Sequence, residues 1–362
     1  MKDIKYLTIV DWIKNEIKTQ GMKSGQKLYS ESELCKIHGV SRQTVRHALS
    51  QLESQNIIWR KHGSGAYVRS VGATKERIMT VGVISTYFSD YIFPSIVTGI
   101  ESVLTKYNVS MQLAITHNLV SEEERALQGM LAQNVDGLIV EPSKSALPNP
   151  NTALYDEVRL RTIPLVFFNA KYPWSDFPCI SIDDVAAGYL ATKHLVHLGH
   201  EKIAGIFMSD NIQGHKRYEG FIKCLNDCGF LMAEYQALWF STNDRDTLFT
   251  LSKDRIIALL QNNTAVVCYN DQIAVSMMEF CRNNGFQVPD DISLVGIDDS
   301  QLARVCEVPL TSVRHPQQLL GEQVAEMLLQ TMINHDTQPE GKLFVPKLVE
   351  RKSAKPPHAG TI

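Results

Sequence analysis

The sequence predicts two folded parts. These are an α+β winged helix-turn-helix domain over residues 1–69 and an α/β domain over residues 78–362, the latter built as two lobes with a doubly wound parallel sheet in each. Three observations predict this. The chain has 362 residues, which is too long for one simple core. Helix patterns and a basic hairpin fill the first seventy residues, whereas strands alternate with helices after residue 78. Residues 70–77, SVGATKER, are polar and aperiodic, so we interpret them as a linker.

Charge is distributed unevenly along the chain. Residues 1–70 hold 12 Lys and Arg against 6 Asp and Glu, while the whole chain has a net charge of −3, so the rest is acidic. A basic module on an acidic body indicates a polyanionic partner at one end. Ordinary variation in surface charge can give the same difference, so the motifs must decide between the two interpretations.

Composition also indicates the cellular compartment of the protein. The seven cysteines are dispersed without a CxxC pair, which favours free thiols in a reducing environment. No run of 18 apolar residues predicts a membrane span, and the N-terminus does not have the pattern of a secretory signal. We therefore expect a cytoplasmic, nucleoid-associated protein with no membrane partner.

The first helix is predicted over residues 5–19. Its packed face carries apolar residues at helical spacing, with lysines between them. These residues are Tyr6, Val10, Ile13 and Ile17.

A second helix is predicted after a glycine-containing loop. Ser30 and Glu33 have the spacing of a capping box that starts it, and Gly39 ends it. Leu34 and Ile37 are expected to form its buried side.

The third helix follows within a few residues, which is the pattern of a helix-turn-helix. Ser41 can cap it, and its predicted inner face carries Val45, Ala48, Leu49 and Leu52. In such a unit the outward residues near the start of the second helix enter the major groove. Those residues are Arg42, Gln43, Thr44 and Arg46. Arginine suits guanine, glutamine suits adenine, and the threonine methyl can contact thymine.

Two short strands, residues 57–61 and 66–69, follow around the turn His62-Gly63-Ser64-Gly65. Glycines permit a tight bend and the close approach of backbone amides to a phosphate. A basic hairpin directly after a helix-turn-helix favours a DNA-reading winged helix over a domain used only for protein contacts. The predicted DNA-binding residues are Lys27, Ser41, Arg42, Gln43, Thr44, Arg46, His62, Gly63 and Gly65.

The stretch LYSESELCKIHGVSRQTVRHALSQLESQNIIWRKHGSGAYV resembles the DNA-binding domain of the GntR family. The likeness rests on a Ser-Glu-x-x-Leu entry, on Val-Ser-Arg-x-Thr-Val-Arg in the third helix and on Gly-x-Gly-x-x-Val in the hairpin. Tyr29 stands where the family usually has Pro, and Asn56 where it usually has Gly. Both are turn positions outside the predicted reading surface. The resemblance implies a double-stranded DNA operator as partner.

After residue 78 the strand-like runs are MTVGVIS, MQLAIT, DGLIVE, PLVFFN, IAGIF, AVVCY and SLVGID. Helical patterns lie between them near residues 93–107, 122–133, 186–198, 216–228, 246–261 and 272–284. Alternating strands and helices imply parallel sheets covered on both faces. The strands are too many for one small sheet, so two lobes are expected.

Doubly wound sheets bind ligands at the carboxyl ends of their strands. The residues that follow strands or begin the next helix here are mostly carboxylates, amides and aromatics, with one arginine. They are Tyr87, Asp90, Tyr91, Phe93, Glu141, Asn169, Asp183, Arg217, Asn270, Asp271 and Asp298. Such a set suits a sugar, whose hydroxyls both donate and accept and whose C–H face packs on aromatic rings. Individually, Asp and Asn at these positions often only cap the next helix.

Several segments resemble the LacI-type sensor domain, which has the fold of periplasmic sugar-binding proteins. They are DDVAAGYLATKHLVHLGH, HKRYEGFIKCL, CYNDQIAVSMME, ISLVGIDDS, LTSVRHP and LVERKSA. The resemblance implies that Arg217, Asn270 with Asp271, Asp298 and His315 line an effector cleft. It also implies three chain crossings between the lobes, with residues 78–170 and about 311–335 in lobe 1, and residues 171–310 and 336–362 in lobe 2.

A GntR-type reader joined to a LacI-type sensor, together with TYFSDYIFPSIVTGIES and DGLIVEPSKSALPNPN, resembles the arabinose repressor family of Gram-positive bacteria. That likeness implies L-arabinose as effector, a homodimer on palindromic operators, and genes for arabinose uptake and catabolism as targets. A different pentose or hexose effector is the alternative within the same architecture.

A sugar-converting enzyme is the remote alternative. The first strand–turn–helix, VGVISTYFSD, has no GxGxxG, and the chain contains no GxSxG, P-loop or HExxH motif. His194, His197 and His200 fall near a helix end and do not share one face, so we predict no metal site. We therefore expect a regulator without cofactor, not an enzyme.

Overall fold

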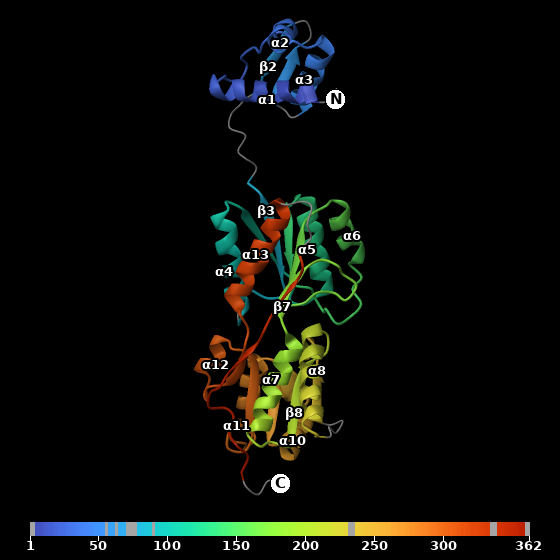
Figure 1. Ribbon diagram of the computed structural model, residues 1–362. Coiled ribbons are helices and arrows are strands. Elements are labelled where there is room, and N and C mark those ends of the chain that lie inside the picture. The colour runs from blue at the N-terminus through green and yellow to red at the C-terminus, as the bar shows by residue number, and fades with distance from the viewer. Residues whose placement is uncertain are drawn as a thin grey trace. The chain divides into compact units, whose positions relative to one another are not determined.

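The structure is a computed structural model that describes residues 4–54, 57–61, 64–69, 78–88, 91–230, 236–333 and 339–358 (Figure 1). The chain divides into two compact units, Met1–Ile78 and Met79–Ile362. The predicted linker, residues 70–77, lies outside the described residues. No helix of the described ranges is long and apolar enough to cross a membrane.

The first unit contains three helices and a hairpin: α1 (Ile4–Thr19), α2 (Glu31–His38), α3 (Arg42–Ser54), β1 (Ile58–Lys61) and β2 (Gly65–Val68). Its core is formed by the predicted apolar faces of α1 and α3 together with Leu34 of α2. The predicted capping box is present, because Glu33 N donates to Ser30 Oγ and Ser30 N donates to the Glu33 carboxylate. Gly39 ends α2 in the left-handed conformation, at φ 62°.

One apolar position of this unit was predicted wrongly. Ile37 is 49% exposed, whereas Leu34 is buried. The short helix α2 instead turns Cys35 toward the core and His38 toward Trp12, whose ring meets the imidazole edge-on at 4.8 Å. Because α2 has only 8 residues, tertiary packing decides which of its faces is buried.

The hairpin is antiparallel, with Ile58 paired to Val68 and Lys61 to Gly65. The rings of Trp59 and Tyr67 form a cross-strand stacked pair, with centroids 4.8 Å apart. Such pairs stabilise an otherwise marginal two-stranded sheet. Leu28 N also donates to Ala66 O at 2.8 Å, which ties the hairpin to the segment before α2.

The second unit has two six-stranded sheets, one in each lobe. The lobe 1 sheet has the order β13-β7-β6-β5-β3-β4 and is parallel throughout. Its strands are β3 (Thr80–Ser85), β4 (Ser110–Ile115), β5 (Gly137–Val140), β6 (Leu165–Phe168), β7 (Cys179–Ile182) and β13 (Lys342–Phe344). Its helices are α4 (Phe93–Lys106), α5 (Val120–Ala132), α6 (Thr152–Leu160) and α13 (Gln317–Ile333).

The lobe 2 sheet has the order β14-β12-β11-β10-β8-β9, and only its β12–β14 pair is antiparallel. Its strands are β8 (Ile203–Met208), β9 (Ala237–Phe240), β10 (Ala265–Cys268), β11 (Ser293–Asp298), β12 (Thr311–Arg314) and β14 (Lys347–Val349). Its helices are α7 (Asp184–His197), α8 (Ile212–Asp227), α9 (Leu248–Leu251), α10 (Lys253–Asn262), α11 (Asp271–Asn283) and α12 (Gln301–Val305).

The predicted lobe boundaries need three corrections. Strand β7 pairs with β6, so lobe 1 continues to residue 182 and does not end at 170. Strand β12 pairs with β11 in lobe 2, although residues 311–335 were assigned to lobe 1. Strand β13 pairs with β7 in lobe 1, although residues 336–362 were assigned to lobe 2. In each case backbone pairing with a strand distant in sequence decides the lobe.

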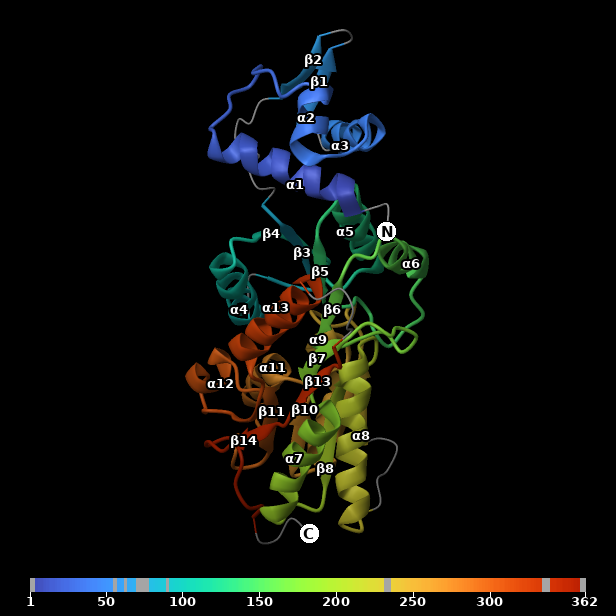
Figure 2. The ribbon, with the colours of Figure 1, turned by 45° about the horizontal axis from the view of Figure 1, so that its top comes forward.

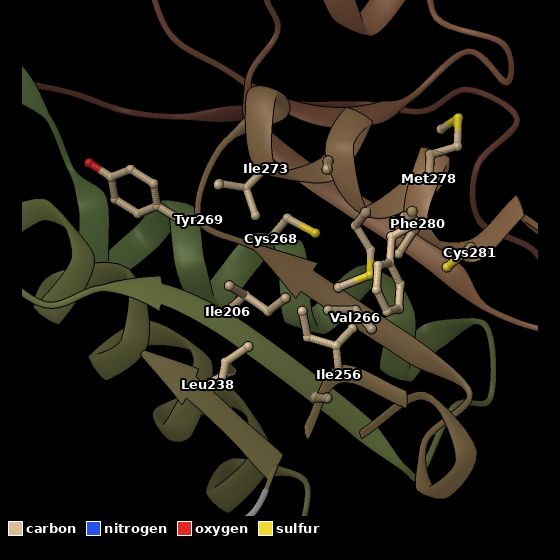
Figure 3. Close-up of a cluster of buried hydrophobic side chains, with 14 of the residues drawn as sticks. Ile206, Leu238, Ile256, Val266, Cys268, Tyr269, Ile273, Met278, Phe280 and Cys281 are labelled. Carbon is tan, nitrogen blue, oxygen red and sulfur yellow. The ribbon is translucent and has the colours of Figure 1, made fainter. Parts of the chain in front are cut away.

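Each sheet is covered on both faces, which explains why its strands are almost continuously apolar. In lobe 1 Val81 and Val83 of β3 pack on α4 and α13, while Ile84 packs on α5 and α6. In lobe 2 one core lies against α7 and α8 and the other against α10 and α11. Figure 3 shows the second of these, where Ile206, Leu238 and Val266 from three strands meet helical side chains. Figure 2 shows α13 alongside α4 in lobe 1 and α7 beside α8 in lobe 2.

Helices α7 and α8 approach each other through glycine. A Cβ built on Gly188 would lie 2.0 Å from Arg217 O, and one on Gly220 would lie 2.0 Å from Val185 O. This close approach places Arg217 of α8 beside Asp184 at the start of α7.

We expect Gly220→Ala to lower the free energy of unfolding by about 1–3 kcal/mol, because the added methyl group overpacks backbone that cannot move aside cheaply. Gly129→Ala on α5 is the matched control, since a Cβ there meets no atom within 4 Å. That substitution should instead stabilise the chain by about 0.4–1 kcal/mol. Thermal unfolding of both variants measures the difference. Equal melting temperatures would contradict the close-packing argument.

Candidate functional site

The exposed side of α3 in the first unit presents the residues predicted to read DNA. Thr44 N donates to Ser41 Oγ at 3.3 Å, so Ser41 caps α3 as predicted. Arg42 and Gln43 are exposed, while Thr44 is half-buried. Arg46 is exposed and donates through Nε to both carboxylate oxygens of Glu31, at 3.2 and 3.0 Å.

The contact with Glu31 affects how Arg46 can bind DNA. Only Nε of Arg46 contacts Glu31, so the outer end of the guanidinium is left to meet a ligand. A guanidinium held at its inner nitrogen is pre-oriented for the two-bond recognition of guanine or phosphate.

Lys27 is exposed beside the hairpin, and its Cε lies 3.0 Å from where a Cβ on Gly65 would be. Gly65 has φ +121°, a conformation that side-chain-bearing residues rarely adopt, so this position requires glycine. His62 and Gly63, also predicted to contact DNA, lie outside the described residues.

The second unit contains a cavity between its two lobes, with a volume of about 690 Å³ including its open mouth. The lining comes from both lobes and combines aromatic rings, amides, carboxylates and two arginines. It consists of Thr86, Tyr87, Tyr91, Ile92, Phe93, Glu141, Asn169, Met208, Asn211, Gln213, Arg217, Phe240, Arg245, Tyr269, Asn270, Gln272, Ile273, Asp298 and His315.

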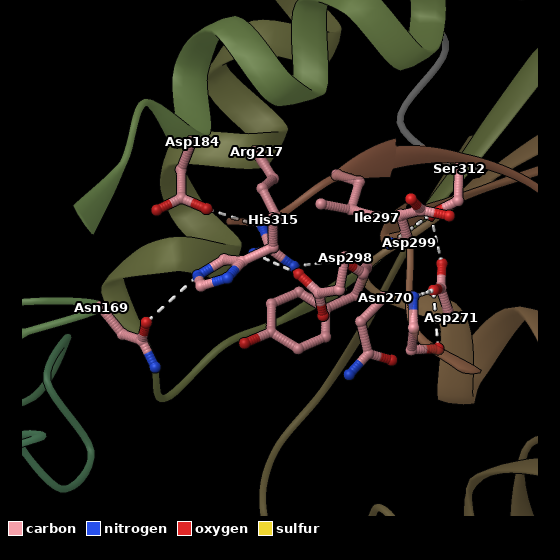
Figure 4. Close-up of polar contacts among 12 residues, drawn as sticks. Asn169, Asp184, Arg217, Asn270, Asp271, Ile297, Asp298, Asp299, Ser312 and His315 are labelled. Carbon is pink, nitrogen blue, oxygen red and sulfur yellow. Dashed lines mark hydrogen bonds and ion pairs between the residues drawn. The ribbon is translucent and has the colours of Figure 1, made fainter. Parts of the chain in front are cut away.

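Arg217 is a buried polar group of the cavity wall, only 3% exposed. It donates Nε to Asp184 at 2.8 Å, Nη2 to Asp298 at 3.3 Å and Nη1 to Tyr269 O at 2.6 Å (Figure 4). Burial alone would lower the pKa of Arg217, but the charges of Asp298 and Asp184 raise it, so the guanidinium stays protonated. The arginine therefore compensates two buried carboxylates and fixes one wall of the cavity.

His315 also joins the lobes. Its Nε2 lies 3.2 Å from Asn169 Oδ1 (Figure 4). Asn169 Nδ2 in turn donates to Glu141 at 2.7 Å. Burial, with the nearby charge of Arg217, lowers the pKa of His315 to about 3, so the ring is neutral. With Asn169 Oδ1 accepting, Nε2 carries the proton and Nδ1 is an acceptor. That Nδ1 is buried without a hydrogen-bond partner.

Tyr91 makes the second bridge between lobes. Its hydroxyl donates to the Asp298 carboxylate, with Ile297 O as a second acceptor at 3.2 Å, while Asp271 N donates to the hydroxyl oxygen. Burial raises the pKa of Tyr91 far above its usual value, so the phenol remains a donor. Burial also raises the pKa of Asp298 to about 6, against the opposing effect of Arg217.

Three of these residues have left-handed backbone: Tyr91 at φ 70°, Asn169 at φ 61° and Asp298 at φ 115°. Such conformations cost about 1–3 kcal/mol each in residues with a side chain, and they cluster at ligand sites. Here they turn Asn169, which follows β6, and Asp298, which ends β11, toward the cavity.

Two predicted effector residues do not line the cavity. Asp183 caps α7 by accepting from Ala186 N at 2.9 Å, and it faces a separate hollow along α7 and α8. Asp271 lies behind the wall, where its carboxylate accepts from the side chains of Ser300 and Ser312 (Figure 4). In both cases the hydrogen-bonding needs of the local backbone and core hold the carboxylate away from the ligand space.

A third predicted residue, Asp90, lies outside the described residues. The remaining predicted residues, Tyr87, Tyr91, Phe93, Glu141, Asn169, Arg217, Asn270, Asp298 and His315, are brought together at the cavity.

Several lining residues were not predicted: Thr86, Ile92, Met208, Asn211, Gln213, Phe240, Arg245, Tyr269, Gln272 and Ile273. Many of them end or follow a strand, so the rule applied to the acidic residues would have found them. Arg245 is different, because it follows β9, a strand not recognised in the sequence. It lies 5.0 Å above the ring of Tyr87 and donates to Gln272 at 2.7 Å.

Comparison with known families supports both units separately. Residues 5–68 match the bacterial regulatory proteins of the gntR family, and residues 192–354 match the periplasmic binding protein-like domain. Among solved structures, the transcription regulator CcpA of Lactococcus lactis has a TM-score of 0.69 at 24% identity, covering 77% of this chain and 100% of that one. The CelR–cellobiose complex has a TM-score of 0.68 at 23% identity, covering 87% and 92%. These likenesses confirm the predicted fold.

Two curated relatives match nearly the whole chain. The arabinose metabolism transcriptional repressor of Geobacillus stearothermophilus is 38% identical, covering 97% of this chain and 98% of its own. That of Halalkalibacterium halodurans is 36% identical, covering 97% and 96%. The prediction of a transcriptional regulator, as opposed to an enzyme, is confirmed by these relatives. The chain belongs to the family of arabinose metabolism transcriptional repressors.

Proposed function

We propose that this repressor binds L-arabinose in the interlobe cavity and is thereby released from operators that control arabinose uptake and catabolism genes. The observation that carries the proposal is a cavity lined by polar groups from both lobes, in a chain of this family. Each hydroxyl of a pentose needs a donor and an acceptor, and the lining offers both kinds. Glu141 and Asp298 accept, the Arg217 guanidinium donates, and His315 Nδ1 accepts.

Aromatic rings complete the chemistry of the site. The rings of Tyr87 and Phe93 lie 5.5 Å apart at the cavity, and Tyr269 lies under Arg217 with the guanidinium carbon 4.9 Å from its ring centroid. Ring faces pack against the C–H side of a sugar. An epimer would leave one buried carboxylate or amide without its partner, which makes such a site selective.

The proposed mechanism links the cavity to the reader through a homodimer on a palindromic operator. Support for the dimer comes from a solved structure of the same fold, the Lac repressor dimer bound to operator, with a TM-score of 0.64 at 23% identity. Sugar that contacts both lobes favours the closed arrangement by its differential contacts. A coupling of about 1–3 kcal/mol would change operator affinity about 5- to 150-fold.

Isothermal titration of the full chain with L-arabinose, D-xylose, D-galactose and D-arabinose tests the effector. We expect selective binding of L-arabinose, followed by loss of operator binding when the same sugar is added to the protein–DNA complex. Selective binding of another sugar would change the assigned effector but would leave the proposed mechanism in place. Binding of L-arabinose without any change in operator affinity would contradict the proposed release.

The affinity for L-arabinose should depend on pH through Asp298. Its pKa is raised to about 6, and a hydroxyl that donates to this carboxylate favours the ionised form. Affinity is therefore expected to fall as the pH drops below 6. His315 contributes nothing in this window, since its pKa is lowered to about 3. Titrations between pH 5 and 8 measure this, and constant affinity across the range would exclude Asp298 as an acceptor.

A further inference from the structure

The two lobes also touch outside the cavity, at the edge of the sheets away from the chain crossings. The crossing strands β7 and β13 lie at one edge of the lobe 1 sheet, and β12 and β14 at the matching edge of the lobe 2 sheet. The contact comes from segments after β4 and β5 of lobe 1 and after β8 and β9 of lobe 2. If the lobes close by rotating about the chain crossings, the segments at the opposite edge move farthest. Contacts between those segments therefore have a large effect on closure.

Backbone and side-chain hydrogen bonds make this contact. Asn118 Nδ2 donates to Asn211 Oδ1 at 3.1 Å and to Thr242 Oγ1 at 2.6 Å. Ile212 N, at the start of α8, donates to Ser145 Oγ at 3.0 Å, and Ala146 N donates to Asp210 O at 3.2 Å. Every one of these bonds joins one lobe to the other.

An ion pair accompanies these bonds. Asp210 is 3% exposed, and its Oδ1 is buried without a hydrogen-bond partner. Lys144 Nζ of the other lobe lies 3.7 Å from Asp210 Oδ2, and no other ion pair is formed by Asp210 within the described ranges. When the lobes separate, water can solvate the aspartate. When they close, the lysine must offset the loss of that solvation.

A buried carboxylate holds the lobe 1 side of the contact in place through hydrogen bonds within lobe 1. Glu123, which is fully buried, accepts from Ser143 N at 2.6 Å, Asn149 Nδ2 at 2.9 Å and Tyr172 OH at 2.8 Å. Lys144 N in turn donates to Asn118 Oδ1 at 2.8 Å. The loop of residues 143–151 is thus shaped by its own lobe before it meets lobe 2.

We propose that Asn118 and residues 144–146 of lobe 1, with residues 210–212 and Thr242 of lobe 2, form a latch that sets the free energy of lobe closure. The latch rests on the proposed function, because it tunes the affinity for the same sugar. Asn118, Lys144, Ser145 and Asp210 do not line the cavity, whereas Asn211 does, so the latch adjoins the ligand space at one residue. If only the closed form binds tightly, apparent affinity scales with the closed fraction.

Two substitutions remove latch contacts without touching the cavity. Ser145→Ala leaves Ile212 N–H unpaired only when the lobes are closed, and Lys144→Met leaves Asp210 without its cation in the same state. Each is expected to weaken L-arabinose binding by about tenfold. Ser143→Ala is the matched control, because its hydroxyl donates to Thr116 Oγ1 within lobe 1 at 2.9 Å. We expect this control to bind like the wild type.

Titration calorimetry of the full chain gives the affinities, and hydrogen exchange read by mass spectrometry reports on residues 143–147 and 210–213. The proposal requires that L-arabinose slows exchange in both segments of the wild type and does so less in the Ser145→Ala and Lys144→Met chains. Wild-type affinity in both variants, or an equal loss in Ser143→Ala, would overturn the latch.

Failure of the effector assignment can be distinguished from failure of the latch. If the wild type does not bind L-arabinose, the effector assignment fails, and the latch is judged by exchange in sugar-free protein. Residues 210–213 must then exchange faster in Ser145→Ala than in Ser143→Ala. Equal rates would overturn it.

Discussion

Arg217→Ala should abolish sugar binding and also destabilise lobe 2. The substitution leaves Asp184 and Asp298, which are 2% and 3% exposed, buried without the cation that compensates them. Removing one partner of a buried pair costs about 3–5 kcal/mol, because an uncompensated charge remains in a medium that solvates it poorly. We expect L-arabinose affinity to fall at least about 100-fold, with a clear decrease in melting temperature.

Because loss of folding would hide the effect on binding, Arg217→Lys is the more informative variant. It keeps the charge between the two carboxylates but cannot also donate to Tyr269 O in the planar geometry of arginine. This variant should fold, bind its operator and respond weakly to sugar. Arg255→Ala, on the exposed side of α10, is the matched control and should behave as wild type. Wild-type sugar affinity in Arg217→Lys would show that the guanidinium does not contact the ligand.

Arg46→Ala is expected to weaken operator binding by about 10- to 100-fold and to leave sugar binding unchanged. The side chain is 66% exposed, so its ion pair with Glu31 adds little to stability. A two-bond contact between arginine and a base contributes about 1–3 kcal/mol of discrimination, and that contact is what the variant loses. Fluorescence anisotropy with operator and scrambled duplexes, at fixed salt, measures both affinity and specificity.

Two further variants show which kind of contact Arg46 makes. Lys14→Ala removes an exposed charge from α1 and controls for the general attraction of a basic domain to DNA. Arg46→Lys keeps the charge but loses the two-bond geometry. If Arg46→Lys retains full affinity and specificity, the residue contacts phosphate and does not read a base. Unchanged binding by Arg46→Ala would remove α3 from the reading surface altogether.

Local chemistry explains what could be predicted from the sequence. The Ser30–Glu33 capping box and the left-handed Gly39 mark the two ends of one helix. Each depends on neighbouring residues only, so sequence spacing alone identifies it. The buried strands of both sheets are short apolar runs flanked by polar turns, which predicts a two-lobed α/β domain. Residues after strands converge at one sheet edge as a consequence of parallel topology, and Glu141, Asn169 and Asp298 follow that rule.

Residues that depend on a distant partner could not be assigned in this way. Asn270 and Asp271 are neighbours, yet one faces the cavity and the other accepts from Ser300 and Ser312 behind the wall, because the start of α11 turns them in different directions. Strands β7, β12 and β13 joined other sheets than expected, since their pairing energy comes from strands far away in the chain. The contact of Lys144 with Asp210 spans two lobes. The sequence alone determined the elements and the chemical character of their ends. Only the tertiary structure decided which ends meet, because burial and hydrogen bonding across lobes depend on residues that no local pattern relates.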